Sequence, residues 1–259
     1  MKRTPPERMR WVAIAWIASL AVSGAAAALD AKNSETAANK ETTRALPADS
    51  PKSSETTWYV RSLIGSEFGA IMTHYWSKGS LFRADTVVAG HPITTIVDES
   101  RYYIYDSILA DGASIERNPA SIAEDATRGR PFARELRELL AAGAEKVSEG
   151  FLEEGSIGYE VYQLTNENGR QRVQVTKTDP PLPIQVETFV RETGATGVLE
   201  YAGWQRGFAL RDSFFEPPNT IVFERVSYLE YTSRFGKVPI GPAPVYYRSL
   251  LHGSRKQNR

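Results

Sequence analysis

Short strand-like segments separated by turn signals dominate the sequence from residue 57 onward, and they limit what this chain can fold into. Each segment is rich in β-branched and aromatic residues and ends at a cluster of Gly, Pro, Asp or Ser. Parallel strands need a crossover of about a dozen residues or more between them, and these turns are shorter than that. The pattern therefore predicts an antiparallel meander. Its first five strands are expected at residues 58–64, 70–76, 81–88, 93–97 and 101–106.

A helical segment interrupts the strands. Residues 131–142 begin with a proline that suits a first helical position, and four apolar side chains recur at i, i+4, i+7 and i+8. Residues 121–124 have the spacing of a capping box, which predicts a second, short helix. The apolar stripe of the longer helix consists of Phe132, Leu136, Leu139 and Leu140.

Further strands are expected after the helix, at residues 159–165, 170–177, 184–191, 197–201, 204–210 and 221–234. A single long antiparallel sheet would leave one broad apolar face in water unless another element covered it. The amphipathic segment 131–142 has a stripe that can cover such a face. We therefore expect an α+β, mainly β fold in which a curved sheet wraps around one or two amphipathic helices.

Residues 1–28 have the three parts of a secretory signal peptide. A cationic start precedes an apolar run over residues 11–22, and small side chains follow it. We expect cleavage near Ala28 and export to the periplasm. The alternative is an uncleaved anchor, because residues 11–29 are just long enough to span a bilayer. Residues 29–56 are almost free of large apolar side chains, which predicts a flexible polar linker.

Composition and motifs exclude several classes of function. The chain has no cysteine, so disulfides, thiolate metal sites, a cysteine nucleophile and lipobox acylation are ruled out. Its 31 basic and 31 acidic residues balance, which does not fit a nucleic-acid binder. No GxSxG, GxGxxG, Walker-type or HExxH motif is present.

The three histidines, His74, His91 and His252, are far apart in the sequence. His74 alternates with Met72 and Trp76 on one face of a strand, so we interpret it as a packed or hydrogen-bonded imidazole. The sequence therefore predicts no catalytic residue, no metal site and no cofactor. We do not expect an enzyme.

Aromatic residues are the more informative feature, with 12 Tyr, 10 Phe and 5 Trp. They are typical of an ordinary β-sheet core, and they also suit an apolar cavity that holds acyl chains. Composition alone favours the ordinary core. However, Tyr102, Tyr103 and Tyr105 place aromatic side chains on both faces of one strand, which favours a sheet covered on both faces.

Four segments resemble, in order, the motifs of one known family. YWSKGSLFR at 75–83 resembles its W-x-K-x-P-x-x-F, and TIVDESRYYIYD at 95–106 resembles its I-x-V-x-D-G-x-x-x-W-x-Y-(D/N). RPF at 130–132 is similar to its (T)-P-F-x-L-L, and DSFFEPPNTI at 212–221 is similar to its closing F-x-F-x-P-P-x-G-V. The family is the outer-membrane lipoprotein carrier superfamily, which includes the LolA, LolB, RseB-type and mycobacterial lipid-binding proteins.

The resemblance implies an unclosed antiparallel barrel, or half-barrel, over residues 57–235. Its interior would bind acyl chains without a cofactor. The composition of residues 236–259, independently of the resemblance, predicts a Pro/Gly-rich basic tail. Lys78 lies near the position where the carriers have a basic residue that helps to hold the lid. The implied ligand-binding residues are Trp76, Phe82, Tyr103, Phe132, Leu136, Leu139, Leu140 and Phe215.

The same resemblance implies a soluble, monomeric periplasmic carrier or chaperone that transports lipids or lipid-modified proteins. Segment 131–142 would act as its lid. The alternative is a non-transporting envelope sensor or assembly module on the same fold. An envelope protein would then be the partner, and the tail would be one of its contacts.

Overall fold

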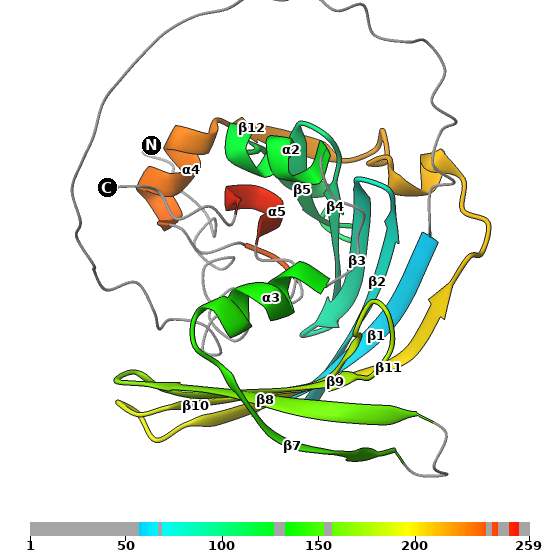
Figure 1. The fold of residues 1–259 in the computed structure, drawn as a ribbon. Coiled ribbons are helices and arrows are strands. Elements are labelled where there is room, and N and C mark those ends of the chain that lie inside the picture. The colour runs from blue at the N-terminus through cyan, green and yellow to red at the C-terminus, as the bar shows by residue number, and fades with distance from the viewer. Residues whose placement is uncertain are drawn as a thin grey trace, which may run out of the picture.

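The computed structural model describes residues 57–66, 69–126, 133–152, 157–236, 240–242 and 249–253. Its largest element is a 12-stranded sheet in the order β12-β6-β5-β4-β3-β2-β1-β11-β10-β9-β8-β7. The sheet curves strongly and encloses helices on its concave side (Figure 1). It does not close on itself, because β12 and β7 form its two edges. The predicted mainly β half-barrel is thus confirmed.

The bounds of the elements are as follows. The first group of strands is β1 (Thr57–Ser66), β2 (Gly69–Lys78), β3 (Leu81–Val88), β4 (His91–Val97), β5 (Arg101–Asp106) and β6 (Asp111–Glu116). The second group is β7 (Glu145–Phe151), β8 (Gly158–Asn166), β9 (Gly169–Thr176), β10 (Pro183–Val190), β11 (Thr196–Arg206) and β12 (Val222–Val226). The helices are α2 (Pro119–Ala126), α3 (Ala133–Ala141), α4 (Tyr228–Phe235), α5 (Ser249–His252) and the 3-10 turn η1 (Asp212–Phe215).

Two antiparallel meanders meet at β1. Strands β1 to β6 form the first meander and β7 to β11 the second, and β11 pairs with β1 to join them. The pair β12–β6 is parallel. This is possible because residues 207–221 carry the chain from β11 around the outside of the sheet to the far edge before β12 begins (Figure 1).

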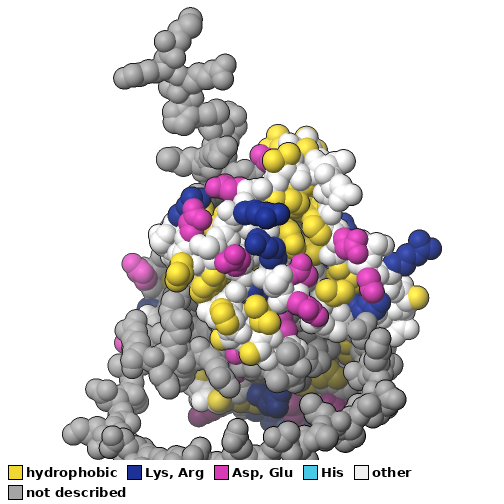
Figure 2. Space-filling model, turned by 90° about the horizontal axis from the view of Figure 1, so that it is seen from above, with side chains coloured by type: hydrophobic (Ala, Val, Ile, Leu, Met, Phe, Trp, Pro, Cys, Tyr) yellow, Lys and Arg dark blue, Asp and Glu magenta, His cyan; other side chains and the backbone are white. Residues whose placement is uncertain are grey.

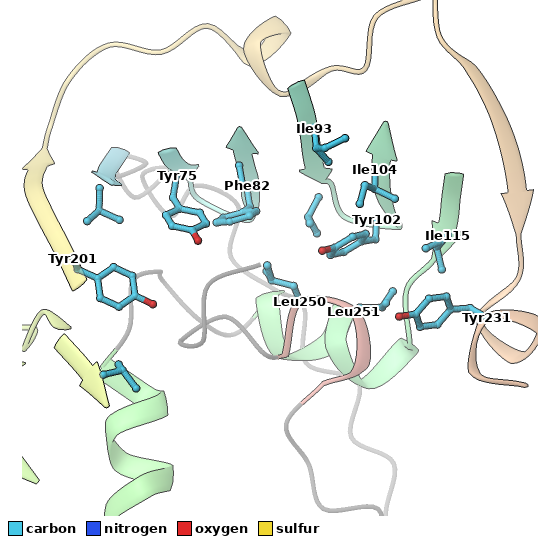
Figure 3. Close-up of a cluster of buried hydrophobic side chains, with 14 of the residues drawn as sticks. Tyr75, Phe82, Ile93, Tyr102, Ile104, Ile115, Tyr201, Tyr231, Leu250 and Leu251 are labelled. Carbon is cyan, nitrogen blue, oxygen red and sulfur yellow. The ribbon is translucent and has the colours of Figure 1, made fainter. Parts of the chain in front are cut away.

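Every second residue of the strands faces the concave side, as the two-residue period of a strand requires. On β3 this places Phe82, Ala84 and Thr86 inside, and all three are buried. The helices α2, α3 and α5 lie against this face (Figure 1). The resulting core includes Val60, Tyr75, Phe82, Ile93, Tyr102, Ile115, Leu136, Val173, Val186, Tyr201, Tyr231, Leu250 and Leu251 (Figure 3).

The convex side is also covered near β4 and β5. Ile96 faces outward, yet its side chain is fully buried. The rings of Tyr103 and Tyr105 pack edge-on against Phe223 of β12, with centroid distances of 5.4 and 5.9 Å. Since Tyr102 is buried on the opposite face, the expectation that this strand is covered on both faces is confirmed.

Part of the second strand group differs from the sequence-based expectation. Residues 221–234 were expected to form one strand, but they form β12 and then α4. The break occurs because Ser227 caps the helix, its side chain accepting a hydrogen bond from the backbone N–H of Glu230 at 3.2 Å. Strands β6 and β7 were not expected at all.

The C-terminal segment is a second difference. Residues 236–259 were expected to form a tail outside the domain, but Ile240 packs against the core and residues 249–252 form α5. Leu250 and Leu251 of α5 are only 1 % and 0 % exposed. These two leucines stand in a polar, glycine- and proline-rich stretch, where their burial has no periodic signal. Residues 243–248 and 254–259 lie outside the described part of the chain.

Arg117 connects three parts of the fold. Its Nε donates to the backbone carbonyl of Leu250 at 2.6 Å, and one Nη donates to the carbonyl of Asp98 at 2.5 Å. The other Nη donates to the hydroxyl of Ser121 and forms an ion pair with Asp125. Because the Arg117 side chain is fully buried, these acceptors supply the hydrogen bonds that water would otherwise provide.

We expect the substitution Arg117→Met to lower the free energy of unfolding by about 3–5 kcal/mol, because it leaves a mostly buried carboxylate and two carbonyls without this donor. Urea denaturation at pH 7 measures the change. Arg170→Met is the matched control, since its ion pair with Glu187 lies at the surface with both side chains partly exposed and contributes about 1 kcal/mol or less. Equal unfolding midpoints for the two variants would refute this role of Arg117.

Candidate functional site

The candidate site is the interior between the concave face of the sheet and the helices. Helix α3 lies across this interior, next to the half of the sheet that β8, β9 and β10 form (Figure 1). Its Leu136 belongs to the buried core, and Leu139 packs against the core from a partly buried position. The second sheet half contributes Val173 and Val186 to the same cluster. The interior walls are therefore mostly hydrocarbon.

Tyrosine hydroxyls add polar groups to these walls. Tyr75, Tyr102 and Tyr201 come from β2, β5 and β11, and their rings extend from the sheet toward the interior (Figure 3). The hydroxyl of Ser62 donates to the hydroxyl of Tyr75 at 3.2 Å. Burial raises the pKa of Tyr75 to about 12, and burial likewise raises the pKa of Tyr102. Both phenols are therefore neutral at physiological pH.

The structure separates the predicted ligand-binding residues into two groups. Phe82, Leu136 and Leu139 face the interior. Trp76 and Tyr103 lie on the convex face, because they are in register with Arg83 and Ile96, the outward-facing neighbours in β3 and β4. Leu140 is 38 % exposed on α3. Phe132 lies outside the described residues.

Trp76 belongs to a row of stacked rings on the convex face. Its ring lies 5.8 Å from that of His74 at an interplanar angle of 17°, and His74 in turn stacks on Tyr59 at 6.0 Å. The hydroxyl of Tyr59 and Nδ1 of His74 form a hydrogen bond of 2.9 Å. Phe214 packs edge-on against Trp76 at 5.2 Å. The expectation of a packed and hydrogen-bonded His74 is thus confirmed, although the face is the outer one.

Lys78 and Arg83 hold the segment that runs outside the sheet. Nζ of Lys78 donates to the carbonyl of Leu210 at 3.1 Å and to the carboxylate of Asp212 at 2.5 Å. The guanidinium of Arg83 donates to the carbonyl of Phe214 at 2.9 Å and lies 4.5 Å from the centre of that ring. Phe215, another predicted ligand residue, is buried in this same segment. Through these two hydrogen bonds Lys78 holds residues 207–221, whereas the resemblance implied that it holds the lid.

The remaining histidines lie in two separate places. His91 Nδ1 is 2.6 Å from a carboxylate oxygen of Asp106, and His252 Nδ1 is 3.0 Å from the hydroxyl of Tyr228. Within the described ranges, no group of three or more His, Asp or Glu side chains has the arrangement of a metal site. The described helices also include none with the length and apolar character needed to cross a bilayer.

Sequence reasoning missed the roles of four residues: Arg117, Ser121, Leu250 and Leu251. In the sequence, Arg117 is visible only as a charged residue between a strand and a helix. Its hydrogen-bond acceptors come from distant parts of the chain. Ser121 was noted for its capping-box spacing, yet its hydroxyl donates to the carbonyls of Ser249 and Leu250. Pairings over this sequence distance leave no local pattern.

The fold and site define an open, mainly β half-barrel with an apolar, hydroxyl-bearing interior. No protein-family model matches the sequence, and no curated protein matches it. Solved structures do resemble it. An uncharacterised conserved protein from Thermus thermophilus has a TM-score of 0.45 at 13 % identity, with 66 % of this chain and 91 % of that chain covered.

Two further neighbours carry more descriptive names. The MucA/MucB complex from Pseudomonas aeruginosa has a TM-score of 0.33 at 11 % identity, covering 64 % of this chain and 57 % of that chain. A putative outer membrane lipoprotein-sorting protein domain from Vibrio parahaemolyticus has a TM-score of 0.30 at 11 % identity, covering 64 % and 91 %. At such identities the likeness concerns the class of fold and assigns no activity.

The buried tyrosines predict a loss of stability at alkaline pH. In the unfolded chain a tyrosine ionises near pH 10, whereas in the folded chain burial holds the pKa of Tyr75 at about 12. The stability that these phenols contribute is therefore complete below about pH 9 and is lost as the pH rises from about 10 to 12, at ~1.4 kcal/mol per pH unit for each tyrosine.

Urea unfolding between pH 8 and pH 11 measures this loss. Tyr102→Phe removes one of the groups and should make the decline with pH shallower, because phenylalanine does not titrate. Tyr59→Phe on the convex face is the matched control. A free energy of unfolding that stays constant up to pH 11 in the parent chain would contradict the assignment.

Proposed function

We propose that this protein is a periplasmic binder or carrier of lipids or lipid-modified proteins. Acyl chains would lie between the concave face of the half-barrel and helix α3. The observation that carries the proposal is the interior itself, where hydrocarbon side chains from both halves of the sheet face a helix through Leu136 and Leu139. Each methylene that leaves water for such a site contributes about 0.8 kcal/mol, so a chain of ordinary length binds without any covalent bond.

Helix α3 acts as the lid in this proposal. It presents Leu136 and Leu139 to the core, while Leu140 remains partly in water and Arg137 and Glu138 are exposed. When an acyl chain enters, the apolar side chains of α3 exchange their contacts with the sheet for contacts with the guest. Leu140, which is 38 % exposed, then gains contact with the guest.

The lid hypothesis predicts the effect of a charge on α3. Leu139→Glu should reduce the lipid retained by protein purified from membranes by about tenfold or more, because a carboxylate must lose its hydration to enter the site. Native mass spectrometry measures the retained lipid. Arg137→Glu is the matched control, since it places the same side chain on the exposed side of the same helix. Unchanged lipid in Leu139→Glu would reject the lid.

A second candidate is a sensor or assembly module that binds an envelope protein. The exposed edge of β7 favours it, because Phe151 is 72 % exposed there and Val147 is also exposed. An edge strand with apolar side chains can pair with an extended segment of a partner. The MucB neighbour is solved in complex with MucA, so binding of an envelope protein is a question to test for the present chain.

A change at the β7 edge distinguishes the two candidate functions. The double substitution Val147→Lys and Phe151→Lys should leave lipid retention unchanged and abolish envelope function if β7 is a docking edge. A complementation assay in a strain that lacks the protein, together with native mass spectrometry, separates the two activities. Full complementation by this variant would exclude docking through β7.

A further inference from the structure

The chain places its own C-terminal segment in the middle of the candidate site. Leu250 and Leu251 of α5 project from the helix toward the concave face, between the rings of Tyr201, Tyr102 and Tyr231 (Figure 3). Both leucines belong to the same buried cluster as Phe82 and the valines of the second sheet half. They fill apolar space that an acyl chain would otherwise occupy.

Apart from the hydrogen bond between Nδ1 of His252 and the hydroxyl of Tyr228, the polar contacts that hold α5 are made to its backbone. Nε of Arg117 donates to the carbonyl of Leu250 at 2.6 Å. The hydroxyl of Ser121 lies 2.6 Å from the carbonyl of Ser249 and 2.7 Å from that of Leu250. The backbone N–H of Asn118 donates to the carbonyl of Leu251 at 3.0 Å. Together these groups form a set of donors, which we call the carbonyl cradle, at one end of the apolar interior.

The cradle suits oxygen acceptors that carry no net charge. The guanidinium of Arg117 is already paired with the carboxylate of Asp125, and both side chains are largely buried. An additional carboxylate would therefore be an uncompensated charge in a buried position. A peptide carbonyl, an ester or an amide can accept the same hydrogen bonds without that cost.

Two buried hydroxyls lie on the sheet side of the interior. Among the residues with described positions, the hydroxyls of Thr95 and Tyr102 have no hydrogen-bond partner, although both residues are fully buried. The segment that lies against them is Gly241, where a Cβ would be 2.7 Å from Oγ1 of Thr95 and 3.3 Å from the hydroxyl of Tyr102. A leucine side chain offers no acceptor to either hydroxyl.

A helix of one turn is not stable on its own, so α5 keeps its place through the carbonyl cradle, the burial of its two leucines and the contacts of His252 with Tyr228 and Tyr231. We propose that α5 is a built-in competitor for the acyl site, and that the guest which displaces it is an acyl chain joined through an ester or amide. This inference rests on the proposed function. The guest's hydrocarbon replaces Leu250 and Leu251, and its carbonyl oxygen replaces theirs in the cradle.

A reversible cross-link between α2 and α5 tests the exchange in the full chain. A Cβ at residue 253 would lie 3.3 Å from Cβ of Ala120, close to the separation of about 3.5–4.5 Å in disulfides. The double variant Ala120→Cys and Gly253→Cys contains the only two cysteines of the chain. Residue 253 has a φ of +74°, which disfavours cysteine in both redox states, so comparing the oxidised and reduced forms of one variant cancels this effect.

The probe is radiolabelled 1-monolauroylglycerol in equilibrium dialysis. We expect oxidation to weaken its binding by about tenfold or more, and reduction to restore it, because only the reduced form can release α5. The variant Leu250→Ala with Leu251→Ala should bind the probe more tightly than the parent chain. Leu229→Ala is its matched control, because Leu229 is 79 % exposed on α4.

The outcomes distinguish this inference from the function on which it rests. Equal binding by the oxidised and reduced forms overturns the competitor role of α5 and leaves the acyl site in place. No binding by any form, including the leucine variant, overturns the acyl site and the inference with it. Laurate that binds as tightly as its glycerol ester overturns the preference for an uncharged acceptor.

Discussion

The concave face of an unclosed sheet must be covered, and this requirement organises the whole molecule. Side chains alternate between the two faces of every strand, so half of each strand is presented to the inside of the curve. Closure would bury that face against itself, but here β12 and β7 remain edges. The chain meets the requirement with helices from its middle and with the leucines of α5 from its end. The interior is thus built by segments that are far apart in sequence.

Part of the convex face must also be covered. Ile96, Tyr103 and Tyr105 lie on it, and the chain covers them with β12 and the segment that leads to it. Lys78 and Arg83 fix this segment through backbone carbonyls. The surface seen from above the β12 end carries scattered hydrophobic side chains among charges of both signs (Figure 2). Two large apolar side chains at that end, Val222 and Leu229, are mostly exposed.

Strands β1 to β5 were predictable because they are rich in β-branched and aromatic residues and end at clear turns. The same reasoning missed β7, whose sequence EKVSEGF buries no face and so carries no alternation of apolar residues. It also assigned Trp76 and Tyr103 to the interior, because a motif identifies a strand but not which face of that strand is concave. That choice depends on the register with neighbours such as Arg83 and Ile96. The position of α5 was beyond sequence reasoning for a related reason, since its contacts with Arg117 and Ser121 join distant segments.

The central place of β1 in the sheet has a consequence for how the chain acquires its shape. This strand comes first in the described sequence, and β2 can pair with one of its edges at once. Its other edge belongs to β11, which is synthesised only after most of the domain. A chain that emerges from its N-terminal end therefore carries an unsatisfied strand edge through most of its emergence, and pairing across so long a loop is slow. During that interval the open edge of β1 can pair with a wrong strand.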